Sequence, residues 1–268
     1  MEKQAKTGSK AGMQVLLSSQ RDIIAKLNSL GLPGAAECYE SQALNPGISG
    51  GLSFEERLQR CLEAEEEHER AMACERIVRK ARFKDRLTLG DIAASPSEGL
   101  TREILQDLCG TGWIRKSVNL FITGGCGVGK TALACAIGYN LASLGISVLY
   151  FQTGDLLASL KCKSDYQARA RAFKKLSSAK VLVLDDFGAG RKFDEDDEDL
   201  LLAIAEARYG AQKPLVICSQ YMRNGFYDLF TGKAGAEGIM DRLVHPSYEV
   251  ALKGMSRRTL KAASITDD

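Results

Sequence analysis

The sequence predicts an α/β domain built on a parallel sheet and preceded by a small all-helical region. Three observations lead to this prediction. From residue 100 onward, short apolar segments alternate with helical ones, which is typical of a parallel sheet covered on both faces. A glycine-rich turn directly follows the first apolar segment, and residues 13–86 show helical patterns.

The N-terminal region is expected to be helical after a short tail. Residues 1–12 are polar and are predicted to be disordered, and helices are predicted over residues 13–30 and 35–44, each followed by Gly and Pro. Ser53 stands three residues before Glu56, a capping-box pattern, so a long helix is expected from there to about residue 82. Residues 13–86 are therefore predicted to be one helical domain.

The second domain is expected over residues 100–258, after a linker at 87–99 and before a tail at 259–268. Thr101 is a candidate cap for a helix that ends at Cys109. Further helices are expected over residues 130–144 and 200–208. Five strands are predicted, at residues 119–123, 147–152, 180–184, 215–218 and 248–252.

Composition excludes several classes of protein. The chain has 268 residues, 45% apolar and 26% charged, which is enough for one large domain and a smaller one. No apolar run approaches the roughly 20 residues that span a bilayer, and no secretory leader is recognisable. We therefore expect a cytoplasmic protein without a membrane partner. The 8 cysteines form no C-x-x-C pair, so no structural metal is expected.

The net charge of +2 hides an uneven distribution. Residues 55–69 are strongly acidic, and residues 70–86 are basic. Basic segments attract polyanions, of which nucleic acid is the commonest; the alternative is a solvated helix with blocks of opposite charge. The candidate DNA-binding residues are Arg70, Arg76, Arg79, Lys80, Arg82, Lys84 and Arg86.

The glycine-rich turn matches the phosphate-binding loop pattern G-x-x-x-x-G-K-[ST], with a strand before it and a helix after it. Its residues are Gly124, Gly125, Cys126, Gly127, Val128, Gly129, Lys130 and Thr131. The glycines allow successive N–H groups to face phosphate oxygens, and the helix presents its positive end to the same anion. Lys130 is expected to reach the β- and γ-phosphates of ATP, and Thr131 to ligate Mg²⁺.

Two acidic residues, Asp185 and Asp186, end the predicted strand at 180–184. The carboxyl ends of parallel strands open into the ligand crevice. Two neighbouring carboxylates repel each other unless a cation lies beside them. Asp185 is therefore the candidate Mg²⁺ ligand, and Asp186 the candidate for orienting the attacking water.

Other candidates are less specific. Ser219 and Gln220 end the fourth predicted strand and are expected beside the γ-phosphate. Arg242, just before the last strand, is a candidate arginine finger for a neighbouring subunit's nucleotide; a surface ion pair is the alternative. The acidic run at 194–199 is interpreted as a solvated helix start stabilised by the helix dipole, rather than a metal site.

These motifs together resemble the transposition-helper ATPases of the IstB family, AAA+ proteins related to the DnaC helicase loaders. The resemblance covers about residues 22–258. It includes the segment Leu30-Gly31-Leu32-Pro33-Gly34, the phosphate-binding loop, the strand ending in Asp185-Asp186, and the segment Asp241-Arg242-Leu243-Val244-His245. The resemblance implies an AAA+ ATPase domain with a five-stranded parallel sheet.

The resemblance also implies roles for single residues. Lys130 and Thr131 correspond to the Walker A pair, and Asp185 to the Walker B magnesium ligand. Asp186 stands where AAA+ proteins usually have a catalytic glutamate, and its shorter side chain suggests slow or partner-dependent hydrolysis. Ser219 and Gln220 occupy the sensor-1 position, Arg242 matches the arginine finger, and Arg258 is a candidate nucleotide contact at the sensor-2 position.

Family members bind duplex DNA largely without sequence preference, assemble on it as ATP-dependent oligomers and recruit a transposase. The resemblance therefore implies these partners, with ATP and Mg²⁺ as cofactors and hydrolysis driving disassembly. The alternatives are a replicative helicase loader, a nucleotide-switched scaffold that hardly hydrolyses ATP, and a small-molecule P-loop kinase. A kinase needs an arginine-rich lid and an acceptor pocket, and neither is recognisable in the sequence.

Overall fold

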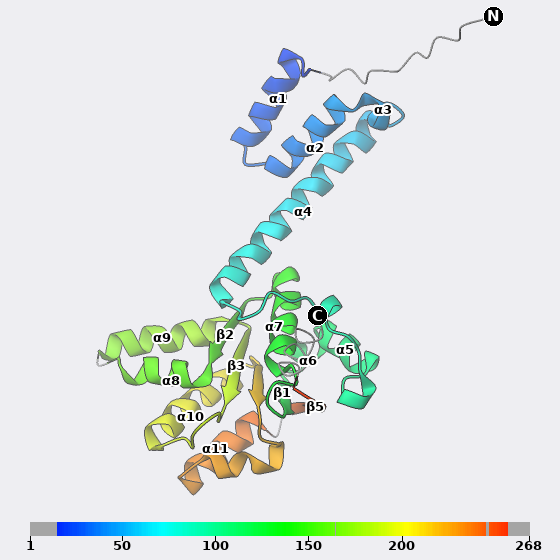
Figure 1. Ribbon diagram of the computed structural model, residues 1–268. Coiled ribbons are helices and arrows are strands. Elements are labelled where there is room, and N and C mark those ends of the chain that lie inside the picture. The colour runs from blue at the N-terminus through cyan, green and yellow to red at the C-terminus, as the bar shows by residue number, and fades with distance from the viewer. Residues whose placement is uncertain (1–14, 164, 245–246, 257–268) are drawn as a thin grey trace, which may run out of the picture. The chain divides into compact units, whose positions relative to one another are not determined.

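Five parallel strands form the centre of the second part of the chain (Figure 1). The computed structural model describes residues 15–163, 165–244 and 247–256. The chain divides into two compact units, Met1–Met72 and Ala73–Asp268. The predicted boundary at residue 86 differs from this division, which falls inside the long helix.

The first unit consists of helices. They are α1 (Ser18–Ser29), α2 (Pro33–Leu44), α3 (Pro46–Ser49) and the larger part of α4 (Phe54–Ala81). The predicted capping box is present, since Ser53 N donates to Glu56 Oε2 at 2.7 Å and Glu56 N donates to Ser53 Oγ at 3.2 Å. Small residues let α2 approach α4, where buried Glu65 accepts a hydrogen bond of 2.9 Å from Ala35 N.

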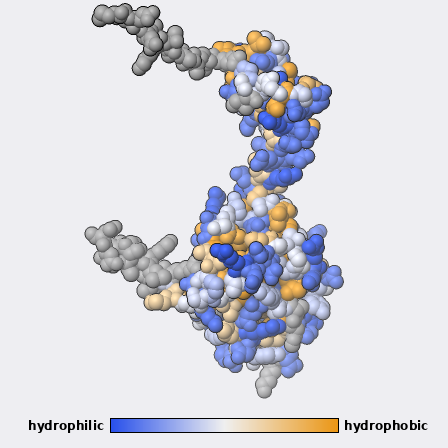
Figure 2. Space-filling model, turned by 90° about the vertical axis from the view of Figure 1, so that its right-hand side faces the viewer, coloured by the Kyte–Doolittle hydropathy of each residue, from blue (hydrophilic) through white to orange (hydrophobic). Residues whose placement is uncertain are grey.

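The exposed surface of α4 is mainly hydrophilic (Figure 2). In its acidic half, Glu63, Glu66, Glu67 and Glu69 are exposed, whereas Glu65 is buried. The helix ends at Ala81, and Arg82 follows with a φ of 59°. The last turns of α4 belong to the second unit.

The sheet has the strand order β2-β3-β4-β1-β5, and all neighbours are parallel. Its strands are β1 (Asn119–Gly124), β2 (Val148–Gln152), β3 (Val181–Phe187), β4 (Leu215–Ser219) and β5 (Ser247–Leu252). All five predicted strands are confirmed. β3 is longer than predicted, so Asp185 and Asp186 lie within the strand rather than after it.

Apolar side chains alternate between the two faces of the sheet. Phe121, Leu182 and Leu184 belong to one buried cluster, whereas Leu120 and Ile122 belong to the other. The first face is covered by α8 (Thr153–Lys161), α9 (Tyr166–Ser178), α10 (Glu195–Gly210), η3 (Arg223–Leu229) and α11 (Lys233–Leu243). The second is covered by α5 (Arg102–Cys109), α6 (Gly112–Arg115) and α7 (Lys130–Ser143) (Figure 1).

Two buried polar side chains secure the N-terminal edge of the sheet. Arg208 is 1% exposed and donates to the carbonyls of Leu176, Ala179, Lys180 and Pro214 at 2.8 to 3.3 Å. Burial lowers the pKa of Arg208 to about 10. Asn119 donates to Leu243 O at 2.9 Å and accepts from Leu215 N at 2.8 Å, so it links the starts of β1 and β4.

The helices were predicted less completely than the strands. The helix after Thr101 is confirmed, and Thr101 Oγ1 accepts from Ile104 N at 3.2 Å. The helix at 200–208 extends over Glu195–Gly210. Helices α8, α9 and α11 were not predicted. The predicted first helix starts later than expected, because residues 15–17 are not helical and α1 begins at Ser18.

The prediction of a linker at residues 87–99 is wrong, because this segment is folded and packed. This segment contains the short helices η1 (Leu89–Asp91) and η2 (Pro96–Glu98). Ile92 is buried in the core of the second unit, and Lys253 N at the end of β5 donates to Glu98 O at 2.8 Å. The segment is therefore part of the second unit, because its apolar residues pack on that unit's sheet.

The acidic run is only partly a solvated helix start. Asp194 caps α10 as expected, accepting from Asp197 N at 2.9 Å. Asp197 and Glu198, however, are buried. Asp197 pairs with Lys161 at 2.8 Å and Arg191 at 2.6 Å, and Glu198 accepts from Gly232 N at 3.0 Å. Buried carboxylates need such partners, and neighbouring residues in sequence do not reveal them.

Candidate nucleotide-binding site

The phosphate-binding loop joins β1 to α7 at the C-terminal edge of the sheet. Gly124, Gly127 and Gly129 have φ values of 143°, 79° and 106°, which side chains with a Cβ rarely adopt. This conformation lets the loop curl around the start of α7, where N–H groups of the first helical turn have no partner within the helix. The loop and the helix together form a cradle that suits an anion.

The ammonium of Lys130 is held at this loop. Its Nζ donates to Gly124 O at 3.0 Å and to Gly125 O at 2.7 Å, and the residue is 7% exposed. A lysine ammonium has three donor hydrogens. Two are engaged by the loop, and the third remains for a phosphate oxygen.

Asp185 is buried at the end of β3 and both of its carboxylate oxygens accept a hydrogen bond. Tyr150 OH donates to Oδ2 at 2.6 Å, and Asp186 N donates to Oδ1 at 2.9 Å. Thr153 Oγ1 also holds the strand end by donating to Asp185 O at 2.8 Å. Because a carboxylate has about four lone-pair positions, the side chain is fixed while acceptor capacity remains.

Asp186 has an unusual backbone conformation. Its φ is 53°, and the pairing of β3 with β4 shifts register between Leu184 and Phe187. Such irregularities redirect a side chain at a strand end, and a positive φ outside glycine often marks a functional site. Asp186 is half-buried, in contrast to the fully buried Asp185 beside it.

Gln152, at the end of β2, is a site residue that the sequence analysis missed. In one orientation of its amide, Nε2 donates to Asp186 Oδ2 at 3.4 Å. In the other, it donates to Asp155 Oδ2 and accepts from Lys84 Nζ, both at 3.1 Å. The signal was available, because Gln152 ends an apolar strand just as Asp185 and Ser219 do.

The structure separates the roles of Ser219 and Gln220. Ser219 is 1% exposed; its Oγ donates to Phe187 O at 2.8 Å and accepts from Tyr221 N at 3.2 Å. These contacts tie β4 to β3, so its hydroxyl is engaged by main chain. Gln220 is exposed at the same strand end, and it is the better of the two candidates for a phosphate contact.

Arg242 lies at the opposite edge of the sheet from the phosphate-binding loop. Its main-chain oxygen accepts from Asn119 Nδ2 at 3.1 Å, at the start of β1, whereas the loop begins at the end of this strand of 6 residues. At about 3.3 Å per residue, the strand separates the two by roughly 16 Å. The guanidinium is 30% exposed and pairs with Glu206 at 3.2 Å. Arg242 is therefore not part of its own subunit's site.

The residues at the C-terminal edge fit ATP and Mg²⁺. Thr131 is half-buried in the first turn of α7, and its hydroxyl and the two carboxylates are oxygen ligands of the kind that Mg²⁺ prefers. Beyond β5, Ser256 lies against Gly127, and the candidate Arg258 lies outside the described residues.

All seven basic candidates have exposed side chains. Arg70 belongs to the first unit and pairs with Glu66 at 3.0 Å; the other six belong to the second. In the part of the chain that the structure describes, Arg79, Arg82 and Arg86 form no ion pair with a carboxylate. Within the same residues, no helix combines the length and the apolar character needed to cross a membrane.

Comparison with known proteins agrees with this geometry. The model of the family "IstB-like ATP binding protein" matches residues 25–264. An insertion-sequence ATP-binding protein of Sinorhizobium fredii is 34% identical over 235 residues, which is 87% of this chain and 94% of the relative. One of Mycobacterium tuberculosis is 28% identical over 240 residues, covering 90% and 95% of the two chains.

Two solved structures share the fold of the second unit. The crystal structure of DnaI superimposes with a TM-score of 0.54 at 25% identity, covering 65% of this chain and 91% of that one. The DnaC helicase loader gives 0.50 at 23% identity, covering 62% and 96%. With its nucleotide loop, its strand order and these relatives, the chain belongs to the family of IstB-like ATP-binding proteins and has an AAA+ domain.

Proposed function

We propose that this protein is an ATP-dependent regulator of DNA transposition. It assembles as an oligomer on duplex DNA, recruits a partner transposase, and leaves the DNA when ATP is hydrolysed. One observation carries the proposal: the phosphate-binding loop belongs to the same unit as three exposed arginines, Arg79, Arg82 and Arg86, which form no ion pair with a carboxylate among the described residues. The relatives named for insertion sequences support the link to transposition.

The proposed ATPase chemistry uses the residues at the C-terminal edge of the sheet. Lys130 and the amides of the loop hold the phosphates, and Thr131 and Asp185 hold Mg²⁺. The ion, when bound, neutralises charge on the transferring phosphoryl group. Asp186 orients the attacking water.

The proposed DNA contact uses the basic residues at the end of α4 and after it. Exposed guanidinium and ammonium groups neutralise backbone phosphates without reading bases. This suits a protein that accepts many target sequences.

Oligomer formation gives Arg242 its function. Because it lies at the N-terminal edge of the sheet, it reaches a nucleotide only when a second subunit presents its loop there. Hydrolysis then depends on assembly, which connects the ATP cycle to the DNA-bound state. The ion pair with Glu206 holds the guanidinium ready at the surface.

The decisive experiment is fluorescence anisotropy of labelled duplexes of unrelated sequence, with ATP, ADP or no nucleotide, from 50 to 200 mM salt (about the range over which phosphate contacts lose most of their affinity). We expect tight binding with ATP alone and a steep fall with salt. Arg79→Ala combined with Arg86→Ala is expected to reduce the salt slope by about 1.8, because each lost phosphate contact removes about 0.9. Arg171→Ala, which removes an exposed arginine of α9, is the matched control.

Two outcomes would change the proposal. If no duplex binds in any nucleotide state, the protein acts on another protein, as a helicase loader does. If duplex binds but no phosphate is released with DNA and transposase present, the protein is a nucleotide-switched scaffold.

A further inference from the structure

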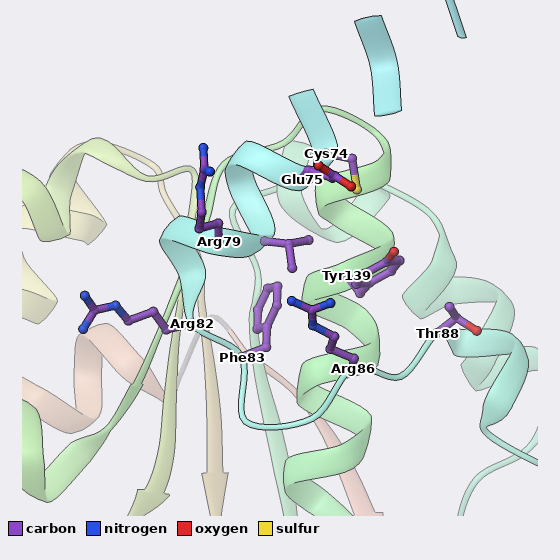
Figure 3. A pocket seen from close by; sticks show the side chains of 9 residues that line it. Cys74, Glu75, Arg79, Arg82, Phe83, Arg86, Thr88 and Tyr139 are labelled. Atoms are coloured by element: carbon purple, nitrogen blue, oxygen red, sulfur yellow. The ribbon is translucent and has the colours of Figure 1, made fainter. Parts of the chain in front are cut away.

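A pocket of about 510 Å³ opens on the second unit between the end of α4, the segment that follows it, and α7 (Figure 3). Its lining includes Arg79, Arg82 and Arg86 together with Phe83 and Tyr139. Figure 3 shows Arg86 next to the Phe83 ring, with Arg82 extending away. We call it the three-arginine pocket. Glu75 also lines it, and the three guanidinium groups outweigh this carboxylate, so the charge of the pocket suits a phosphate group of a polyanion.

One aromatic ring separates this pocket from the core. Phe83 lines the pocket and lies directly on Gly138 of α7, where an added Cβ would stand 2.4 Å from its Cε1. The same ring meets Tyr150 of β2 edge-on, with centroids 6.2 Å apart at 68°. The Phe83 ring fills the space that a side chain at Gly138 would need. Because the packing is this close, a shift of Phe83 must be accommodated by its neighbours.

Tyr150 continues the path to the Walker B carboxylate. It is 7% exposed, Asp185 is 0% exposed, and the hydrogen bond between Tyr150 OH and Asp185 Oδ2 is 2.6 Å long. The phenol holds one of the two carboxylate oxygens, so the rotamer of Asp185 depends on where Tyr150 lies.

We infer that Tyr150 is a positioning residue for Asp185, and that Phe83 makes its position depend on whether a phosphate of duplex DNA occupies the three-arginine pocket. The inference rests on the proposed DNA-binding function and adds to it a route by which DNA regulates the nucleotide site. A phosphate that binds both Arg86 and Arg79 draws them together. The two side chains then press on the Phe83 ring, which lies between them and the core. The ring transmits the change to Tyr150 and so to Asp185.

The first test concerns Tyr150 alone and needs no DNA. A fluorescent, non-hydrolysable ATP analogue is titrated onto the wild type and Tyr150→Phe, with Mg²⁺ and with EDTA. Loss of a hydrogen bond to a charged group predicts affinity about tenfold weaker with Mg²⁺ and unchanged with EDTA. A merely structural role would weaken both equally. Tyr209→Phe, which removes an exposed hydroxyl, is the matched control. Equal Mg²⁺ dependence in wild type and Tyr150→Phe overturns the positioning role.

The second test measures coupling. The affinity for the same analogue with Mg²⁺ is measured with and without a saturating duplex, and the quotient of the two affinities is one ratio. The affinity for duplex is measured with and without analogue, which gives a second ratio. Linkage requires the two ratios to agree. The wild type is expected to show a ratio of at least about fivefold. Phe83→Ala and Gly138→Ala are expected to keep duplex binding within about threefold while the ratio falls to about one. Gly210→Ala, at a helix end with open space, should retain the wild-type ratio.

The outcomes distinguish this inference from the proposed function. Full coupling in both variants overturns the inference and leaves the proposed function intact. Duplex binding without any coupling in the wild type overturns the inference together with the ATP dependence of DNA binding in the proposed function. Absence of duplex binding in the wild type overturns the proposed function and the coupling together. The Tyr150→Phe experiment tests the positioning role in either case, because it uses no DNA.

Discussion

The two edges of the sheet use buried polar side chains for opposite purposes. At the N-terminal edge, Arg208 and Asn119 direct nearly all their hydrogen-bonding groups to main-chain partners. At the C-terminal edge, Lys130 and Asp185 are held in place by similar bonds but keep a donor hydrogen or lone pairs in reserve. Polar groups that are fully engaged stabilise the fold, whereas groups that are fixed but not saturated can bind a ligand.

Loss of Lys130 is expected to have a large effect on turnover. Lys130→Ala removes the positive charge that we propose holds the phosphates, and removal of such a preorganised group is expected to lower turnover by about 1000-fold. Phosphate release measures turnover, and thermal unfolding should show little change because the lysine bonds only loop carbonyls. Retention of more than a tenth of wild-type turnover would contradict its role.

At the other edge, Arg208→Met is expected to affect stability and not chemistry. It leaves four main-chain carbonyls without their buried donor, which costs about 3 kcal/mol of unfolding free energy. Urea unfolding measures this loss, with Arg171→Met as the exposed control. A loss below about 1 kcal/mol would show that water replaces the guanidinium easily.

Asp186 is expected to affect both stability and chemistry, because its backbone is strained and its side chain is a candidate catalytic group. Asp186→Asn tolerates the positive φ and removes the charge, so turnover should fall about 100-fold with stability nearly unchanged. Asp186→Gly should show the same loss of turnover with a gain of about 1 kcal/mol in unfolding free energy, since the left-handed backbone suits glycine. Normal turnover in Asp186→Asn would exclude Asp186 from the hydrolytic step.

Arg242→Ala is expected to leave stability and nucleotide binding intact, and to lower turnover by about 1000-fold or more if the arginine acts as a finger. Glu206→Ala, which breaks the same ion pair from the other side, is the control. Mixing Arg242→Ala with Lys130→Ala should restore turnover, because one supplies an intact site and the other an intact arginine. Normal turnover in Arg242→Ala refutes the finger, and failure of mixing refutes action between subunits.

Much of the fold was predictable because its signals are local. The five strands are short apolar runs, and the Thr101 and Ser53 caps need only residues three positions away. Helices α8 and α9 were missed, although α9 carries a local signal of its own: Asp165 caps it by accepting from Gln167 N and Ala168 N. The supposed linker at 87–99 is packed because Ile92 enters the core, a contact that depends on the distant β5 and α7.

The sequence by itself determined the α/β class, the phosphate-binding loop and the placement of Asp185 and Asp186 at a strand end, because each follows from neighbouring residues. Only the tertiary structure decided which polar groups make all their hydrogen bonds within the protein and which keep a donor or a lone pair for a ligand. Ser219, Asp197 and Glu198 are bonded by partners far along the chain, whereas Tyr150 donates to the Asp185 carboxylate from another strand. The hydrogen-bond partners of each polar group are set by contacts across the sheet, and such contacts leave no local pattern in the sequence.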